Sequence, residues 1–314
     1  MLSRVITAPP SPRTGGEVDL EQLLIATSRT FALAIPLLPE PVRRQVTLSY
    51  LLFRIADTFE DAAAWPRELR MEALEAFSGL MEHPDPAAAE ALARRWAEEV
   101  PCEQPSYREL LAEVPAVLDA FFSLAPRAVE LIASHTARTA RGMAGFVARV
   151  NPAGELRLND VPDLQEYCYV VAGIVGELLT ELFLLDEPAL AAVAAELRGR
   201  SRTFGEGLQL VNILKDSASD ATQGRLYLPE GVHRAHILTL AREDLAVAGA
   251  YARTLQSAGA ARGIVAFNAL PIHLALATLD RVETSGPGAK LSRPEVFSLV
   301  QRMHRALDRN EPAV

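Results

Sequence analysis

Cysteine and aromatic residues are both scarce in this chain of 314 residues. The two cysteines, Cys102 and Cys168, lie far apart in unlike surroundings and do not indicate a disulfide framework or a thiolate metal site. Aromatic residues make up 6% of the chain although apolar residues make up 49%, because alanine and leucine supply much of the apolar content. Both are strong helix formers, so the composition predicts an all-α protein.

Basic residues are in the minority. The chain has 31 lysines and arginines against 40 aspartates and glutamates, which gives a formal net charge of −9 and a pI of about 5.3. A protein that binds nucleic acid by neutralising phosphates needs the opposite balance. We therefore expect no nucleic-acid partner.

The chain also lacks the uninterrupted apolar run of a signal sequence or a membrane span. Residues 1–18 contain proline, arginine and glycine where a secretory signal needs an apolar core, so we predict a flexible leader and a cytoplasmic protein. The most hydrophobic stretches are 169–185 and 264–279. Glutamates interrupt the first, and a proline and a histidine interrupt the second, so neither is predicted to span a membrane.

Strand-like alternation is absent as well, and from Asp19 onward the chain reads as helical segments separated by breaks rich in proline or glycine. We predict one all-α domain over residues 19–314. Its main helices are expected over 41–61, 164–185, 197–220 and 264–282.

The first candidate functional cluster is Asp57-Thr58-Phe59-Glu60-Asp61, at the end of the predicted helix 41–61. Positions i, i+3 and i+4 share a helix face, so Asp57, Glu60 and Asp61 would present their carboxylates together. An isolated DxxED is more often a solvated acidic helix end. Against that interpretation, the helix dipole places negative charge at this end, and a bound cation would relieve the repulsion.

The second cluster lies between Gln209 and Asp220. Asn212, Asp216 and Asp220 are spaced i, i+4 and i+8, so they line one stripe of a helix, with Gln209 close to it. Hard Mg²⁺ prefers oxygen ligands of this kind and commonly bridges carboxylates to a substrate phosphate. Two acidic helix faces on opposite walls of one pocket could hold Mg²⁺ ions that clamp a diphosphate, an arrangement that also favours a single domain.

These clusters belong to a series of blocks that resembles the squalene/phytoene synthase family over roughly residues 23–299. Five blocks occur in the family's order, which makes the resemblance specific. They are Ser28–Phe31 (SRTF), Tyr50–Asp61, Tyr167–Gly176 (YCYVVAGIVG), Gln209–Asp220 and Gly224–Pro229 (GRLYLP).

Two positions depart from the family pattern: Lys215 stands where arginine is common, and Ser219 where glutamate is common. The segment 267–279 resembles the squalene-synthase branch, and the chain looks most like bacterial squalene synthases, without the C-terminal anchoring helix of eukaryotic ones.

The resemblance implies an isoprenoid-synthase fold, a single helical bundle that encloses a central cavity. It implies roles for four sets of residues. The metal set is Asp57, Glu60, Asp61, Asn212, Asp216 and Asp220. The set that binds the substrate diphosphate is Ser28, Arg29, Tyr50, Arg54, Gln209, Asn212, Lys215 and Arg225. The cavity set is Phe31, Val171, Ala172, Gly173, Gly176 and Leu208. The catalytic set is Tyr167 with Asp57, Asp61, Asp216 and Asp220.

The implied activity is a Mg²⁺-dependent prenyltransferase that joins two farnesyl diphosphates head to head, through presqualene diphosphate, to squalene. Mn²⁺ is an alternative metal, and NADPH is implied as the reductant if squalene is the product. A phytoene, dehydrosqualene or presqualene diphosphate synthase that does not use NADPH is the alternative enzyme. An inactive helical partner subunit is the alternative outside catalysis, and the four aspartates argue against it. Peripheral membrane contact and a monomeric or homodimeric state stay open.

Overall fold

The computed structural model describes residues 19–28 and 30–314, so the predicted leader (1–18) and Arg29 lie outside the described residues. The described chain is a helical bundle with one pair of short strands. Its first half comprises α1 (Leu20–Thr27), α2 (Phe31–Ala34), the short 3₁₀ turn η2 (Ile35–Leu37), α3 (Val42–Glu60), α4 (Arg67–Glu82), α5 (Pro86–Glu99), α6 (Pro105–Ala112), α7 (Val114–Phe122) and α8 (Pro126–Val147). Its second half comprises β1 (Leu156–Arg157), α9 (Val161–Cys168), the π-helical turn η3 (Tyr169–Gly173), α10 (Ile174–Asp186), η4 (Pro188–Val193), α11 (Ala194–Thr222), β2 (Arg225–Leu226), α12 (Arg234–Ser257), α13 (Arg262–Ser285) and α14 (Arg293–Asp308).

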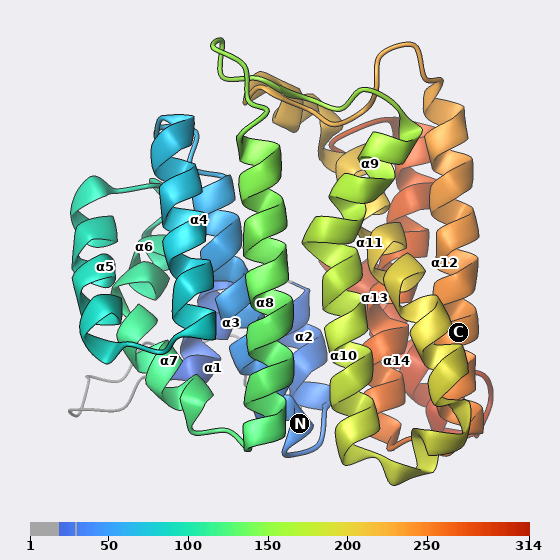
Figure 1. Cartoon of the computed structure of the whole chain (residues 1–314). Helices are drawn as coiled ribbons and strands as arrows, with labels where there is room; N and C mark the ends of the chain where they lie inside the picture. The colour runs from blue at the N-terminus through green and yellow to red at the C-terminus, as the bar shows by residue number, and fades with distance from the viewer. Residues whose placement is uncertain (1–18, 29) are drawn as a thin grey trace.

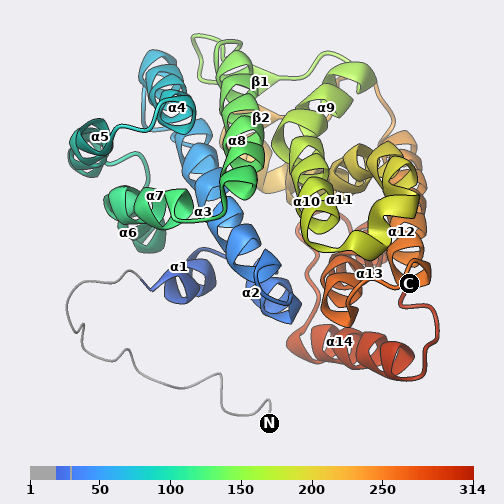
Figure 2. The same cartoon turned by 60° about the horizontal axis from the view of Figure 1, so that its bottom comes forward.

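Helix α8 stands between two groups of helices. Helices α3 to α7 gather on one side of it and α9 to α14 on the other, as Figures 1 and 2 show from two directions. Helix α8 packs against α3, α4 and α10, while α11 packs against α10, α12 and α13. The two groups also meet where α3 contacts α10. This arrangement brings α3 and α11, which carry the two acidic clusters, to opposite walls of one interior space.

Helix α3 is buried because its side chains are apolar on most faces. Leu48, Leu51, Leu52 and Ile55 have no exposed surface. Burying each such side chain contributes roughly 1.5–3 kcal/mol of transfer free energy. The end of this anchored helix carries Asp57 and Glu60, with Asp61 as its C-cap, so their positions are set by the core.

Helices α10 and α11 approach so closely that their backbones touch. A Cβ atom added to Gly176 would lie 2.1 Å from the carbonyl oxygen of Ser201, and one added to Gly205 would lie 2.1 Å from that of Ala172. Real Cβ atoms do not make such contacts, so both positions require glycine. This close packing makes α10 and α11 one rigid wall.

The parallel pair β1 and β2 joins the connection after α8 to the segment after α11. Leu156 lies opposite Arg225, and Arg157 opposite Leu226. Each strand has only two residues, which is too short for an alternating pattern that would predict a strand from the sequence. Their pairing fixes Arg225 beside the end of α3.

The helical predictions hold, with one correction. The predicted helices 41–61, 197–220 and 264–282 correspond to α3, α11 and α13. The predicted continuous helix 164–185 is instead interrupted by η3, between α9 and α10. The π turn cannot be predicted from an apolar sequence, because its hydrogen bonding depends on contacts with neighbouring helices in the folded protein.

By length and composition alone, two helical stretches could cross a membrane, Val161–Asp186 and Arg262–Ser285. Within the bundle, 44% and 61% of their most apolar windows are buried. A helix that is apolar all round is also what the core of a large helical protein requires. Their composition is therefore accounted for by the bundle.

Candidate active site

An apolar cavity of about 220 Å³ lies between α3, η3, α10, α11 and α13. Five of the six residues predicted for the cavity line it: Phe31, Val171, Ala172, Gly176 and Leu208. Five polar residues of the two aspartate-rich motifs also line it: Tyr50, Arg54, Asp57, Gln209 and Asn212. An apolar chamber with polar groups from two facing helices suits a ligand with a long hydrocarbon chain and a polar head.

Gly173 differs from the prediction, because it does not line this cavity. A Cβ atom at Gly173 would lie 2.7 Å from the Tyr169 ring and 3.4 Å from the Arg202 side chain. The π turn rotates Gly173 away from the cavity and into the contact with α11. Its small size therefore serves helix packing.

Arg54, on α3, contacts several polar and aromatic groups at one side of the cavity. Its guanidinium lies 3.2 Å from the Asp57 carboxylate, and its Nε donates to the Tyr50 hydroxyl at 3.4 Å. The Tyr50 hydroxyl in turn donates to the carbonyl of Thr27 at 2.7 Å. The same guanidinium lies over the rings of Tyr50 and Tyr107. A half-buried arginine in an apolar helix needs such partners, and the chain supplies them.

Tyr167 and Glu60 form a buried hydrogen-bonded group. The Tyr167 hydroxyl lies 3.0 Å from Glu60 Oε1 and 2.8 Å from the Tyr227 hydroxyl. The rings of Tyr167 and Tyr227 stack with centroids 4.5 Å apart, and Phe146 meets Tyr167 edge-on. All three polar residues of this group are buried. Neither Tyr167 nor Glu60 is among the residues that line the cavity.

The second acidic face comes from the end of α11. Asp216 pairs with Lys215 at 3.1 Å, and Arg225 reaches across to Asp61 at 3.0 Å. Asp220 experiences the charges of both Asp216 and Asp61. The two motifs, far apart in sequence, therefore share one electrostatic environment.

Burial and mutual repulsion raise the pKa values of three of the carboxyl groups, those of Asp57, Glu60 and Asp220. Burial raises the pKa of Asp57 to about 6, with Arg54 opposing the shift and Asp61 adding to it. Burial also raises the pKa of Asp220 to about 6, and repulsion from Asp216 and Asp61 adds to the shift while Arg225 opposes it. The pKa of Glu60 is raised by burial and by its neighbours Asp61 and Asp57. Perturbed carboxyl groups of this kind are typical of functional sites.

This donor set fits a hard divalent cation in its chemistry. The candidate ligands are all oxygen donors, and a cation would offset the cost of burial and the repulsion that raise the pKa values of Asp57, Glu60 and Asp220. Within residues 19–28 and 30–314, however, no three His, Cys, Asp or Glu side chains form a group that could hold a metal ion as they stand. Arg54, Lys215 and Arg225 pair with the carboxylates instead.

Of the remaining predicted site residues, Ser28 stabilises the start of α2. Its hydroxyl accepts a hydrogen bond from the Phe31 backbone N–H at 2.9 Å. This bond fixes the start of α2, whose first residue lines the cavity. Arg29 lies outside the described residues.

The sequence interpretation did not assign roles to Tyr227, Tyr107 or Arg70. Tyr227 belongs to the GRLYLP block, so the motif itself was the available signal. Tyr107 and Arg70 carry no local signal, because they reach the site only through tertiary contacts with Arg54 and with the carbonyl of Glu60.

Comparison with known proteins places this geometry in a family. The family model described as squalene/phytoene synthase matches residues 24–242. Botryococcus squalene synthase, from Botryococcus braunii, is 29% identical over 223 residues, which cover 71% of this chain and 44% of that protein. Squalene synthase from Eremothecium gossypii is 29% identical over 250 residues, covering 77% of this chain and 54% of that protein. The chain thus spans about half the length of these relatives.

Solved structures show the same fold. TcSQS in complex with the ligand E5700 superposes with a TM-score of 0.72 at 24% identity, covering 90% of this chain and 84% of that one. A dehydrosqualene synthase superposes with a TM-score of 0.54 at 19% identity, covering 92% and 95%. The family model covers more than half of the chain, and the fold agrees. The protein therefore belongs to the squalene/phytoene synthase family.

Proposed function

We propose that this protein is a prenyltransferase that condenses two farnesyl diphosphates head to head, through presqualene diphosphate, to squalene. The observation that carries the proposal is an apolar cavity whose mouth holds Arg54 and Asp57 on one wall and Asn212 on the other. Squalene synthase is also the name of the relatives compared above. The hydrocarbon chain would occupy the cavity, and the diphosphate would lie at the polar mouth.

The basic residues at the mouth are proposed to bind the diphosphate. Arg54 lies in the C-terminal half of α3 and Arg225 is the first residue of β2, each beside a carboxylate of the first motif. Guanidinium groups form strong charge-assisted hydrogen bonds with phosphate oxygens. Lys215, Tyr50, Gln209, Ser28 and Arg29 are proposed to contribute to the same binding.

Mg²⁺, with Mn²⁺ as an alternative, is proposed as the metal. Asp57, Asp61, Asp216 and Asp220 would hold it, with support from Glu60 and Asn212. When bound, the metal would neutralise the charge that develops on the departing diphosphate.

The cavity wall and Tyr167 are proposed to control the carbocation. The apolar side chains of Val171, Ala172 and Leu208 would exclude water, which would otherwise quench the cation. Tyr167, whose hydroxyl is held by Glu60 and Tyr227, is proposed to assist removal of the proton that is lost when the cyclopropane ring closes.

NADPH is proposed as the reductant of the final step. We further propose a cytoplasmic protein in peripheral contact with the inner face of the membrane, because both substrate and product are hydrophobic. The protein is proposed to act as a monomer or a homodimer.

The test is a product analysis. Purified protein is incubated with farnesyl or geranylgeranyl diphosphate and Mg²⁺, with and without NADPH, and the products are identified by mass spectrometry. Squalene formed from farnesyl diphosphate only when NADPH is present supports the proposal. Phytoene, or a product that does not change with NADPH, would replace it with the alternative enzyme. No turnover of either substrate would favour an inactive partner subunit.

A further inference from the structure

The π turn η3 changes the direction in which Tyr167 points relative to the cavity-lining residues Val171 and Ala172. An α-helix bonds residue i to i+4, whereas a π turn bonds i to i+5, so the extra residue rotates the rest of the helix by about 100°. Tyr167 lies just before η3, while Val171 and Ala172 lie within it and line the cavity. The π turn therefore sets how the Tyr167 hydroxyl is oriented relative to the cavity wall.

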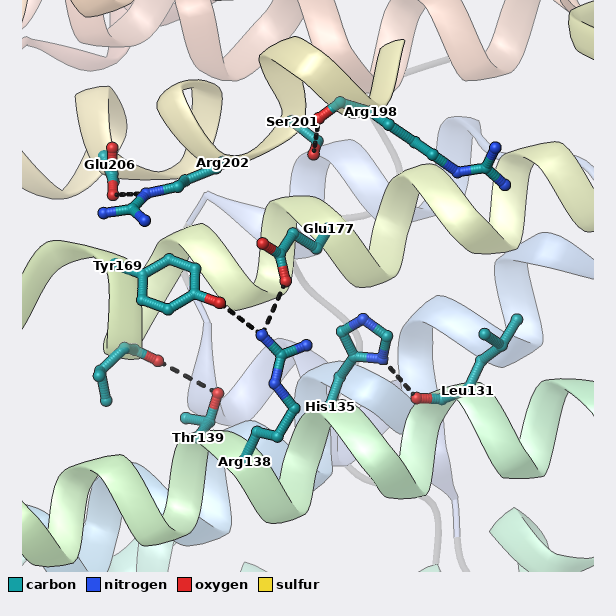
Figure 3. Close-up of polar contacts among 11 residues, drawn as sticks. Leu131, His135, Arg138, Thr139, Tyr169, Glu177, Arg198, Ser201, Arg202 and Glu206 are labelled. Carbon is teal, nitrogen blue, oxygen red and sulfur yellow. Dashed lines mark hydrogen bonds and ion pairs between the residues drawn. The ribbon is translucent and has the colours of Figure 1, made fainter. Parts of the chain in front are cut away.

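Helix α8 holds η3 from one side. The Thr139 hydroxyl donates to the carbonyl of Val170 at 3.1 Å, and Thr139 has no exposed surface. Figure 3 shows this bond together with the residues around it. One turn further along α8, a Cβ atom at Gly142 would lie 2.6 Å from Val170 Cγ1. Valine is stiff at χ1, so the Val170 side chain could not easily rotate away from an added methyl group. Helix α8 therefore needs glycine at position 142 to approach Val170 this closely.

Arg138 of α8 and Arg202 of α11 hold η3 as well. The Arg138 guanidinium donates to the Tyr169 hydroxyl and to Glu177, the latter at 3.0 Å. Arg202, which is paired with Glu206, lies over the Tyr169 ring with its Cζ 4.2 Å from the centroid. Figure 3 shows both arginines converging on Tyr169. On the α11 side, Gly205 meets the Ala172 carbonyl directly. A π turn is an intrinsically unfavourable conformation, and these contacts stabilise it.

We propose that Thr139 is a positioning residue for catalysis: its bond to the Val170 carbonyl keeps η3 in the π conformation and so fixes Tyr167 relative to the cavity wall. The kinetic consequence rests on the proposed function, whereas the effect on η3 does not. Thr139 lies behind the cavity wall and is not among the residues that line the cavity. It would therefore not contact a substrate in the cavity directly.

Thr139→Val tests this with a close control. Thr136 lies on the same helix, is equally buried, and its hydroxyl has no hydrogen-bond partner among the described residues. Thr139→Val should speed amide hydrogen exchange in residues 169–175 by about fivefold to tenfold, the effect of losing one hydrogen bond. In the active enzyme it should lower kcat by a similar factor, with KM for the prenyl diphosphate unchanged. Thr136→Val should change neither quantity, and Thr139→Ser should restore both.

A second pair of variants disturbs η3 without removing a hydroxyl. Gly142→Ala places a methyl group against Val170, whereas Gly145→Ala, on the same helix, places one where no described atom lies within 4 Å. Gly142→Ala should increase exchange in residues 169–175 and lower kcat, while Gly145→Ala should leave both unchanged. Hydrogen exchange can be measured even if the protein turns over no prenyl diphosphate, so failure of the proposed function would be distinguishable. Unchanged exchange and unchanged kcat in both Thr139→Val and Gly142→Ala would overturn the inference.

Discussion

At the scale of single residues, Arg54 joins several groups at the cavity mouth. Asp57, three residues after Arg54 on the same helix, is its anionic partner at 3.2 Å, a pairing that helical spacing allows. Of the two tyrosine rings at the guanidinium, Tyr50 lies one turn before Arg54 on α3. Tyr107 was not predictable, because it comes from α6, a helix that meets α3 only in the folded protein. Contacts one turn apart can be inferred from spacing, whereas contacts between distant helices cannot.

Arg54→Lys keeps the charge but loses the planar guanidinium that contacts Asp57 and both rings. We expect kcat/KM for prenyl diphosphate to fall by about tenfold to a hundredfold, the range for losing a charge-assisted hydrogen bond. Steady-state kinetics measure this effect. Arg44→Lys, an exposed site at the start of the same helix, is the control and should retain activity. Equal activity of the two variants would contradict the role given to Arg54.

Asp244, on α12 and outside the candidate site, makes the stability of the protein depend on pH. Burial raises its pKa to about 7, and the charges of Glu206 and Glu243 add to the shift. The folded protein therefore holds this proton over a range in which the unfolded chain, with the ordinary pKa of 3.8, has lost it. The contribution of the Asp244 carboxyl group to the free energy of unfolding is therefore lost as the pH rises from about 4 to about 7.

Asp244→Asn should therefore stabilise the protein at pH 8, by on the order of 2 kcal/mol, and should have little effect near pH 4. Chemical denaturation at both pH values measures the difference. Glu243→Gln, at an exposed site, should show a much smaller change. A destabilised Asp244→Asn variant at pH 8 would show that the ionised carboxylate makes favourable contacts.

At the scale of helices, the sequence predicts α3, α11 and α13 to within a few residues but does not predict η3. Apolar periodicity marks a helix without showing where its hydrogen bonding changes from i+4 to i+5. That change depends on Thr139 and Gly142 of α8 and on Gly205 of α11, which lie distant in sequence. Likewise, Gly173 looks like a cavity residue in the motif, yet the π turn directs it toward α11.

The α10–α11 contact gives a prediction at this scale. Gly205→Ala would place a methyl group 2.1 Å from the Ala172 carbonyl oxygen, so the two helices must separate. We expect a loss of about 2–3 kcal/mol of unfolding free energy, typical of overpacking. Gly199→Ala, also in α11 but with no described atom within 4 Å, should be neutral or stabilising by up to about 1 kcal/mol. Similar melting temperatures for the two variants would contradict the backbone contact.

At the scale of the whole molecule, the net charge of −9 includes two acidic clusters, at the ends of α3 and α11, and Asp57 of the first cluster lines the apolar cavity. The all-α class and a single bundle follow from composition and from the order of the motifs. The facing of α3 and α11 follows only from the folded contacts, such as that of Arg225 with Asp61. A protein that is acidic overall thus places Arg54 and Arg225 beside carboxylates where an anionic substrate and a cation are proposed to meet.

The central claim is that both acidic faces are needed to release diphosphate from a prenyl diphosphate. The direct measurement is the rate of inorganic diphosphate release from farnesyl diphosphate with Mg²⁺ by the wild-type protein, Asp57→Asn, Asp216→Asn and the exposed control Asp119→Asn on α7. We predict that Asp57→Asn and Asp216→Asn each lower the rate by about a hundredfold or more, with helical circular dichroism unchanged. Asp119→Asn should match the wild type. Wild-type rates in either active-site variant would contradict the account.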